Sequence, residues 1–210
     1  MTDYGRPLAF GFFLNPNAAD YPRLVEVAHL VDDLGLDLIG IQDHPYQSTF
    51  LDTWTLLTAI ATQTQRVGVF PDVANLPLRP PAVLAKAAAS LDVMSGGRVE
   101  LGLGAGGFWD AIAAMGGPRR EPRDAVAALE EAIAVIRLMW SGQRSVRVEG
   151  RFYSLHGVHP GPAPACRVTE YRRGRRRRPH KAGPSTCRDR PPSRRMRLVR
   201  TNARRPRGTP

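Results

Sequence analysis

The chain has 210 residues, enough for one domain with a well-buried core, and a formal net charge of +11. Residues 1–166 carry 13 Lys and Arg against 17 Asp and Glu, whereas residues 167–210 carry 17 against 2, so the basicity belongs to a tail and not to a nucleic-acid-binding globular domain. Both cysteines, Cys166 and Cys187, lie at or beyond this break, and no run of eighteen apolar residues or signal-like start occurs, which predicts a soluble, cytoplasmic protein without thiol chemistry.

A strand followed by a helix is predicted four times along the first 140 residues. The apolar runs begin at residues 8, 36, 67 and 98, where the last is counted from Arg98 before Val99, and a spacing of 28 to 31 residues fits a strand plus a crossover helix. The predicted strands are Leu8–Leu14, Leu36–Ile41, Val67–Phe70 and Val99–Leu103. This alternation predicts an α/β fold with a parallel sheet, either an open doubly wound sheet or part of a barrel, since four units cannot close eight strands.

Apolar residues at helical spacing predict the helices between these strands. Asp20 is the expected N-cap of the first helix, Gly35 its end, and Gly96-Gly97 the end of the third. The predicted buried faces are Leu24, Val27, Ala28, Val31 and Leu34; Trp54, Leu57, Ile60 and Ala61; Val83, Leu84, Ala87, Leu91 and Met94; and Val126, Leu129, Ile133, Ile136 and Trp140. Beyond them, residues 144–155 predict two short strands about Gly150, a hairpin.

The basic tail, residues 167–210, holds few large apolar residues and is expected to be disordered. The run RRGRRRR at 172–178 is compatible with a nucleic-acid-binding arm. We favour translation out of frame, because an interrupted βα repeat leaves a packing problem that a natural arm would not. The expected organisation is therefore a partial barrel domain at 1–166 and an Arg/Pro-rich tail at 167–210.

Polar or small residues follow every predicted strand, on the face where βα folds bind ligands. They are Asn15, then Asp43 and His44, then Asp72 to Asn75, then Gly104 to Gly107. His44 is a candidate proton donor or acceptor, or a residue that merely closes a strand, and Asp43 is a candidate partner or a turn cap. Residues 72–75 could equally form an ordinary connection.

The segment GLGAGG at 102–107 formally matches a dinucleotide fingerprint, which keeps a Rossmann NAD(P) enzyme as an alternative. The first glycine lies inside the predicted strand, however, and no clear long helix follows Gly107. Glycines at this place also allow backbone amides to approach a phosphate or a flat ring. No Walker lysine, HExxH or Cys/His metal spacing occurs, so nucleotide hydrolysis and zinc chemistry are unsupported.

Several longer segments resemble the luciferase-like monooxygenase superfamily, which includes enzymes that use the deazaflavin coenzyme F-420 (F420). The resemblance covers about residues 8–162 and includes LGLDLIGIQDHPYQ, EEAIAVIRLMWSG and the rather specific SLDVMSGGRVELGLGAG. It implies the N-terminal half of a (β/α)₈ TIM-type barrel, FMN or coenzyme F-420 in the barrel mouth, hydride transfer at the ring, a small-molecule substrate and, frequently, a homodimer.

The resemblance also implies roles for individual residues. His44 matches an active-site histidine, and Asp43 beside it matches a cofactor contact. Asp72-Val73 matches the place of a non-prolyl cis peptide behind the ring, which Ala74 and Asn75 continue, while Ala105 and Gly106 match contacts to the ring and phosphate side. Gly107 departs from the family's sugar-phosphate dehydrogenases, which carry a catalytic Glu there, and this disfavours that substrate class.

The resulting expectation is a flavin- or deazaflavin-dependent oxidoreductase or monooxygenase. Because an open half-barrel exposes apolar strand edges, we expect the 210-residue chain itself to be poorly soluble and inactive. The competing function is nucleic-acid binding through the tail, which requires affinity that depends strongly on salt and vanishes without residues 167–210.

Overall fold

The computed structural model describes residues 8–165, 169–171 and 197–201. Three short strands, β1 (Gly11–Leu14), β2 (Leu38–Ile41) and β3 (Gly68–Pro71), form a parallel sheet in chain order. The strand β4 (Leu101–Gly104) continues this arrangement, because parallel bridges join Val69 to Val99 and Ala74 to Leu103. The four predicted strands are therefore confirmed as consecutive parallel neighbours.

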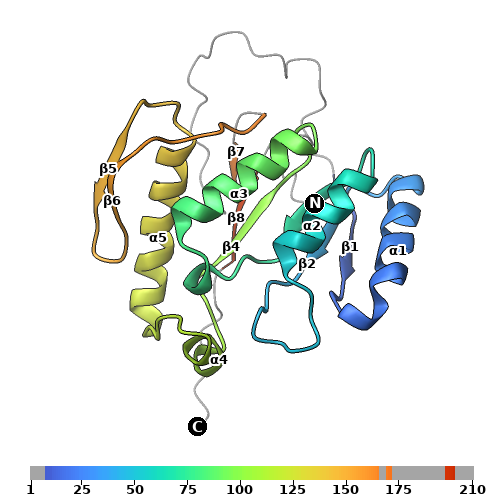
Figure 1. Cartoon of the computed structure of the whole chain (residues 1–210), viewed down its shortest axis with the longest axis horizontal. Helices are drawn as coiled ribbons and strands as arrows, with labels where there is room; N and C mark the ends of the chain where they lie inside the picture. Colours follow the sequence, from blue (N-terminus) through green and yellow to red (C-terminus); the bar gives the residue numbers. More distant parts are fainter. Residues whose placement is uncertain (1–7, 166–168, 172–196, 202–210) are drawn as a thin grey trace, which may run out of the picture.

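Helices connect the strands and follow one another along the sheet, from α1 to α5 (Figure 1). Their bounds are α1 Tyr21–Asp33, α2 Thr53–Gln63, α3 Pro81–Met94, the short α4 Trp109–Ala114 and α5 Pro122–Met139, with single 3-10 turns at Ala18–Asp20 and Leu76–Leu78. Gly35, Gly96 and Gly97 have positive φ after α1 and α3 and end them as predicted. Asp20 makes no capping hydrogen bond; Asn17 caps the preceding 3-10 turn instead.

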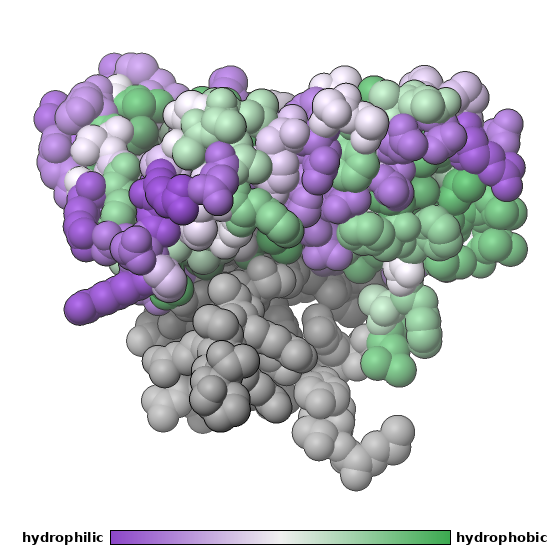
Figure 2. Space-filling model, turned by 90° about the horizontal axis from the view of Figure 1, so that it is seen from below, coloured by the Kyte–Doolittle hydropathy of each residue, from purple (hydrophilic) through white to green (hydrophobic). Residues whose placement is uncertain are grey.

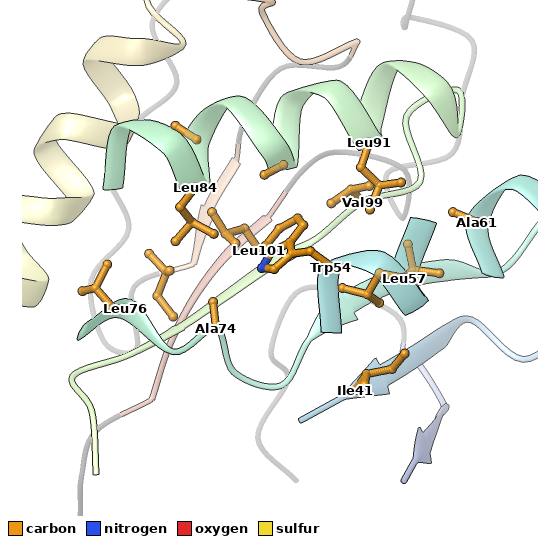
Figure 3. Packing of buried hydrophobic residues seen from close by; sticks show 14 of the residues in the cluster. Ile41, Trp54, Leu57, Ala61, Ala74, Leu76, Leu84, Leu91, Val99 and Leu101 are labelled. Atoms are coloured by element: carbon orange, nitrogen blue, oxygen red, sulfur yellow. The ribbon is translucent and has the colours of Figure 1, made fainter. Parts of the chain in front are cut away.

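The core lies between the helices and one face of the sheet. Figure 3 shows Leu84 and Leu91 of α3 directed toward Leu101 and Val99, all of them buried. Leu57 of α2 belongs to the same buried cluster. Most predicted helix faces are confirmed, including all four residues of α2. The prediction of burial is wrong for four residues, each more than 40% exposed: Leu34, Val83, Met94 and Val126.

Alanines explain the errors on α3 and α5, whereas Leu34 follows the last residue of α1. On α3 the buried stripe includes Ala85, Ala88 and Ala89, and on α5 it includes Ala125, Ala128 and Ala132. A small side chain allows the two helices to approach closely, so the buried face follows the alanines and turns some larger residues toward solvent.

The predicted hairpin is confirmed as β5 (Val146–Glu149) paired antiparallel with β6 (Ser154–Val158) beside α5 (Figure 1). Its turn is fixed by the Glu131 carboxylate of α5, which accepts hydrogen bonds from the backbone N–H groups of Arg151, Phe152 and Tyr153 at 2.6 to 3.1 Å.

Two segments of the basic tail form strands, β7 (Thr169–Tyr171) and β8 (Arg197–Thr201), and β8 pairs in parallel with β4 and β7. A parallel neighbour satisfies free backbone groups at the edge of β4. The disorder expected of the tail as a whole stays a prediction. The other tail residues lie outside the described part of the chain. Within the described residues, no helix is long and apolar enough to cross a membrane.

Candidate active site

A cavity of about 230 Å³ lies where β2, β3 and β4 end. The eight residues to which the family resemblance assigns a site role all line it: Asp43, His44, Asp72, Val73, Ala74, Asn75, Ala105 and Gly106. Tyr46, Gly104, Gly107 and Phe108 complete the lining. Asn15, which follows β1, is exposed and does not line this cavity. Three of the four polar strand ends therefore meet in one place.

Asp43 is the buried charge of the site, with 1% of its surface exposed. One carboxylate oxygen accepts hydrogen bonds from the backbone N–H of Asn75 at 2.9 Å and from Arg79 Nε at 2.7 Å. The other accepts from Arg79 Nη2 at 2.8 Å. This two-pronged pairing neutralises a carboxylate that would otherwise be costly to bury, and it ties the end of β2 to the loop after β3.

The sequence did not predict Arg79 as a site residue, although its side chain forms ion pairs with two carboxylates. Its guanidinium also bonds Asp52 at 2.6 Å, and Asp52 caps α2 by accepting from the N–H of Thr55 at 3.0 Å. Burial raises the pKa of Asp52, but the hydrogen bonds from Arg79 and Thr55 outweigh it and leave the pKa lowered. Burial likewise disfavours the Arg79 cation, yet the two carboxylates raise its pKa.

The loop after β3 forms one wall of the cavity. The Asp72-Val73 peptide is cis, at the position that the family resemblance indicated. The N–H of Ala74 donates to the Gly102 carbonyl at 2.9 Å and so ties the wall to β4. Only glycine fits at position 102, because an added Cβ would lie 2.4 Å from the Pro71 oxygen. Burial raises the pKa of the Asp72 carboxyl.

Asn75 carries a polar atom without a partner. Its side-chain oxygen, Oδ1, is buried and accepts no hydrogen bond within the described residues, although the side chain lines the cavity. A buried acceptor without a donor costs free energy unless something else supplies the donor. A ligand with an N–H group directed at Asn75 would satisfy it.

Three aromatic rings border the cavity. The His44 ring centroid lies 5.4 Å from that of Tyr46 and 5.5 Å from that of Phe108. Burial, and after it the charge of Asp43, raises the pKa of Tyr46. Tyr46 and Phe108 were not nominated, since neither residue type alone marks a site in sequence.

The glycine run at 102–107 leads into α4, which has only six residues and begins at Trp109. A dinucleotide fingerprint requires a long helix directly after the glycines, so the geometry does not support a Rossmann site. Within the described residues, no group of three or more His, Cys, Asp or Glu side chains is placed to hold a metal ion.

Comparison with known proteins gives consistent results. The family profile of the luciferase-like monooxygenases matches residues 8–173. An F420-dependent glucose-6-phosphate dehydrogenase from Kineococcus radiotolerans is 33% identical over 165 residues, which are 74% of this chain and 48% of that protein. The chain thus spans about half the length of the curated relatives it matches.

Solved structures agree on the fold. The monooxygenase RslO1 from Streptomyces bottropensis matches with a TM-score of 0.66 and 24% identity, over 78% of this chain and 53% of that one. The oxygenating constituent of 3,6-diketocamphane monooxygenase from Pseudomonas putida, solved with FMN, matches with a TM-score of 0.64 and 22% identity, over 78% and 52%. The four βα units, which correspond to about half of such a barrel, and the match to residues 8–173 show that this chain belongs to the luciferase-like monooxygenase family.

Proposed function

We propose that this chain is the cofactor-facing half of an oxidoreductase that binds FMN or coenzyme F-420 and acts on a small molecule. The observation that carries the proposal is the gathering of the ends of β2, β3 and β4 around one cavity that contains the buried, unpartnered Asn75 oxygen. The names of two relatives support the choice of cofactor, since one is F420-dependent and another was solved with FMN.

The residues present suit a flat ring with a polar edge. Asn75 Oδ1 offers an acceptor to a ring N–H, and Ala105 and Gly106 present little side chain to a ring face. Asp43 acts mainly through the loop, because its oxygens are occupied by Arg79 and the Asn75 N–H. We assign Asp72 to Asn75 to the wall behind the ring.

His44 is the proposed catalytic residue, because it lies at the cavity and an imidazole can act as a proton donor or acceptor. The cofactor, when bound, supplies hydride transfer. The imidazole would exchange the accompanying proton with a substrate oxygen, while the Asp43–Arg79 pair holds the neighbouring backbone in place.

The proposal extends to the whole protein. Its relatives are about twice as long. We propose that the complete barrel is a cytoplasmic enzyme and, as is frequent in the family, a homodimer. The 210-residue chain alone is proposed to be inactive. We keep the division into a barrel part at 1–166 and a basic tail at 167–210 read out of frame. The other two reading frames past codon 166 should then encode further βα units; if neither does, the frameshift is refuted.

Cofactor titration tests the binding half of the proposal. FMN and coenzyme F-420 are each added to the purified chain, and quenching of cofactor fluorescence is followed. Asn75→Leu removes the acceptor and should weaken binding about three- to tenfold, the size expected for one buried hydrogen bond. Asn15→Leu makes the same change at the exposed end of β1, outside the cavity, and should leave the affinity unchanged. Failure of both cofactors to quench, or equal effects of the two variants, would count against the site.

A further inference from the structure

The strand β4 has a neighbour on each side, and one of the two comes from the basic tail. On the side of β3, the N–H of Glu100, just before β4, donates to the Val69 carbonyl at 3.0 Å. Successive residues of a strand direct their backbone groups to opposite sides. The N–H groups of Leu101 and Leu103 therefore lie along the other side, which we call the outer edge of β4.

The tail strand β8 occupies this outer edge along the whole length of β4. The two strands are parallel, with Leu101 opposite Leu198 and Gly104 opposite Thr201 (Figure 1). An open edge presents unpaired N–H and C=O groups, which act as a template for any extended chain. Gly104 also lines the cavity, so the strand that covers the outer edge extends as far as the rim of the site.

The order of the strands indicates that β8 is inserted between two others. The sheet order is β4-β8-β7, although β7 precedes β8 in the chain. The Asp92 carboxylate of α3 accepts hydrogen bonds from the N–H of Val99, just before β4, at 3.2 Å and from the N–H of Ala165 at 2.8 Å. The chain that leads to β7 thus passes the beginning of β4, where the next strand in chain order would add directly to the outer edge. The strand β8 lies in that place.

We propose that the outer edge of β4 is a strand-accepting site, and that residues 197–201 fill it in place of the next strand in chain order. Main-chain hydrogen bonds supply the affinity in this mode of recognition, and they place few demands on the side chains of the added strand. A tail read out of frame can therefore fill the site without having evolved for it. The inference concerns backbone pairing and depends on neither the proposed cofactor nor the proposed reaction.

Hydrogen exchange of single backbone amides in the full chain tests the inference. Val199→Pro removes an N–H group and restricts the backbone in the middle of β8, so it should release this strand from β4. We then expect the amides of Leu101 and Leu103 to exchange at least about tenfold faster, and the amide of Glu100, which faces β3, to keep its rate. Val199→Thr retains a residue that favours strands and should leave all three rates unchanged, because the pairing depends on the backbone.

The matched control is Ala203→Pro, which places a proline in the tail outside β8 and should leave every rate as it is. If Val199→Pro also accelerates exchange at Glu100, Arg200→Pro breaks β8 at the next position and is measured in its place. Unchanged exchange at the two outer-edge amides, acceleration by the threonine variant or by the control, or acceleration at Glu100 in both proline variants of β8 would overturn the inference. Protection that rises with protein concentration would also overturn it, because the strand would then come from a second copy of the chain.

Discussion

At the scale of single residues, Arg79 organises the site more than any residue that the sequence nominated. Its side chain is 21% exposed and meets the fully buried Asp43 carboxylate and the half-exposed Asp52. Without the guanidinium, Asp43 would be a buried anion held only by the N–H of Asn75. The wall of the cavity therefore depends on a cation that does not itself line it.

Replacing Arg79 by Met should lower the free energy of unfolding by about 3 kcal/mol, because it leaves the buried Asp43 charge unpaired. Urea unfolding at pH 7 measures the change. Adding Asp43→Asn removes that charge and should restore part of the loss, so that the double variant is more stable than the sum of the single changes predicts. Strict additivity would show that the pair contributes no coupling.

The sequence predicted the site residues at the strand ends but not the pairing of Arg79 with Asp43. Asp43, His44 and Asn75 follow predicted strands, and the alternation of strands and helices places strand ends on one face. Arg79 lies 36 residues from Asp43 in a proline-rich loop, and no local pattern indicates such a pairing. Phe108 was missed because its exposure follows from a backbone conformation that periodicity does not reveal.

At the scale of elements, Asp32 joins the end of α1 to the start of β3. Its buried carboxylate accepts hydrogen bonds from the backbone N–H groups of Gln65, Arg66 and Val67 at 2.6 to 2.8 Å. Burial raises the pKa of Asp32, but these N–H groups and the charge of Arg66 outweigh it and hold the pKa below 3.8. The strand and helix pattern predicted both elements, whereas this link depends on a residue that reads as an ordinary polar helix end.

Asp32→Asn should lower the free energy of unfolding at pH 7 by about 2 kcal/mol, the size expected for hydrogen bonds to a charged acceptor. A lowered pKa means that the contribution is fully present above 3.8 and disappears as the pH falls through the folded-state value. The gap between the variant and the unchanged chain should therefore narrow below pH 3.8 in denaturant titrations. The neighbouring Asp33→Asn is the control, since Asp33 is exposed, and a gap of equal size there would contradict the assignment.

At the scale of the whole molecule, the sheet has an open side at β1. Leu8, Phe10, Phe12 and Phe13 are 43% to 80% exposed, and β1 pairs only with β2 within the described residues. Figure 2 shows apolar surface toward the side of the molecule where β1 and α1 lie. The relatives are about twice as long and so have further chain that could cover such a surface. This agrees with the sequence, which predicted four βα units and not the eight that close a barrel.

The chain should associate as its concentration rises, because exposed apolar side chains beside a free strand edge favour contact between copies. Replacing Phe10 and Phe13 together by Lys should shift sedimentation toward the monomer. Leu34→Lys, at the exposed end of α1, offers a control of similar exposure. A monomer at every concentration, or an equal effect of the control, would rule out the β1 surface as the cause.

The hydrogen bonds of Arg79 to Asp52 and Asp43 also connect two separate parts of the fold. Through Asp52, Arg79 touches the first turn of α2, and through Asp43 it touches the N–H of Asn75, so one guanidinium spans the start of a helix and the wall of the cavity. Local opening of either place breaks bonds that the other shares. We therefore expect the two regions to open together, and we expect a ligand that orders Asn75 to slow the fraying of α2, which it does not contact.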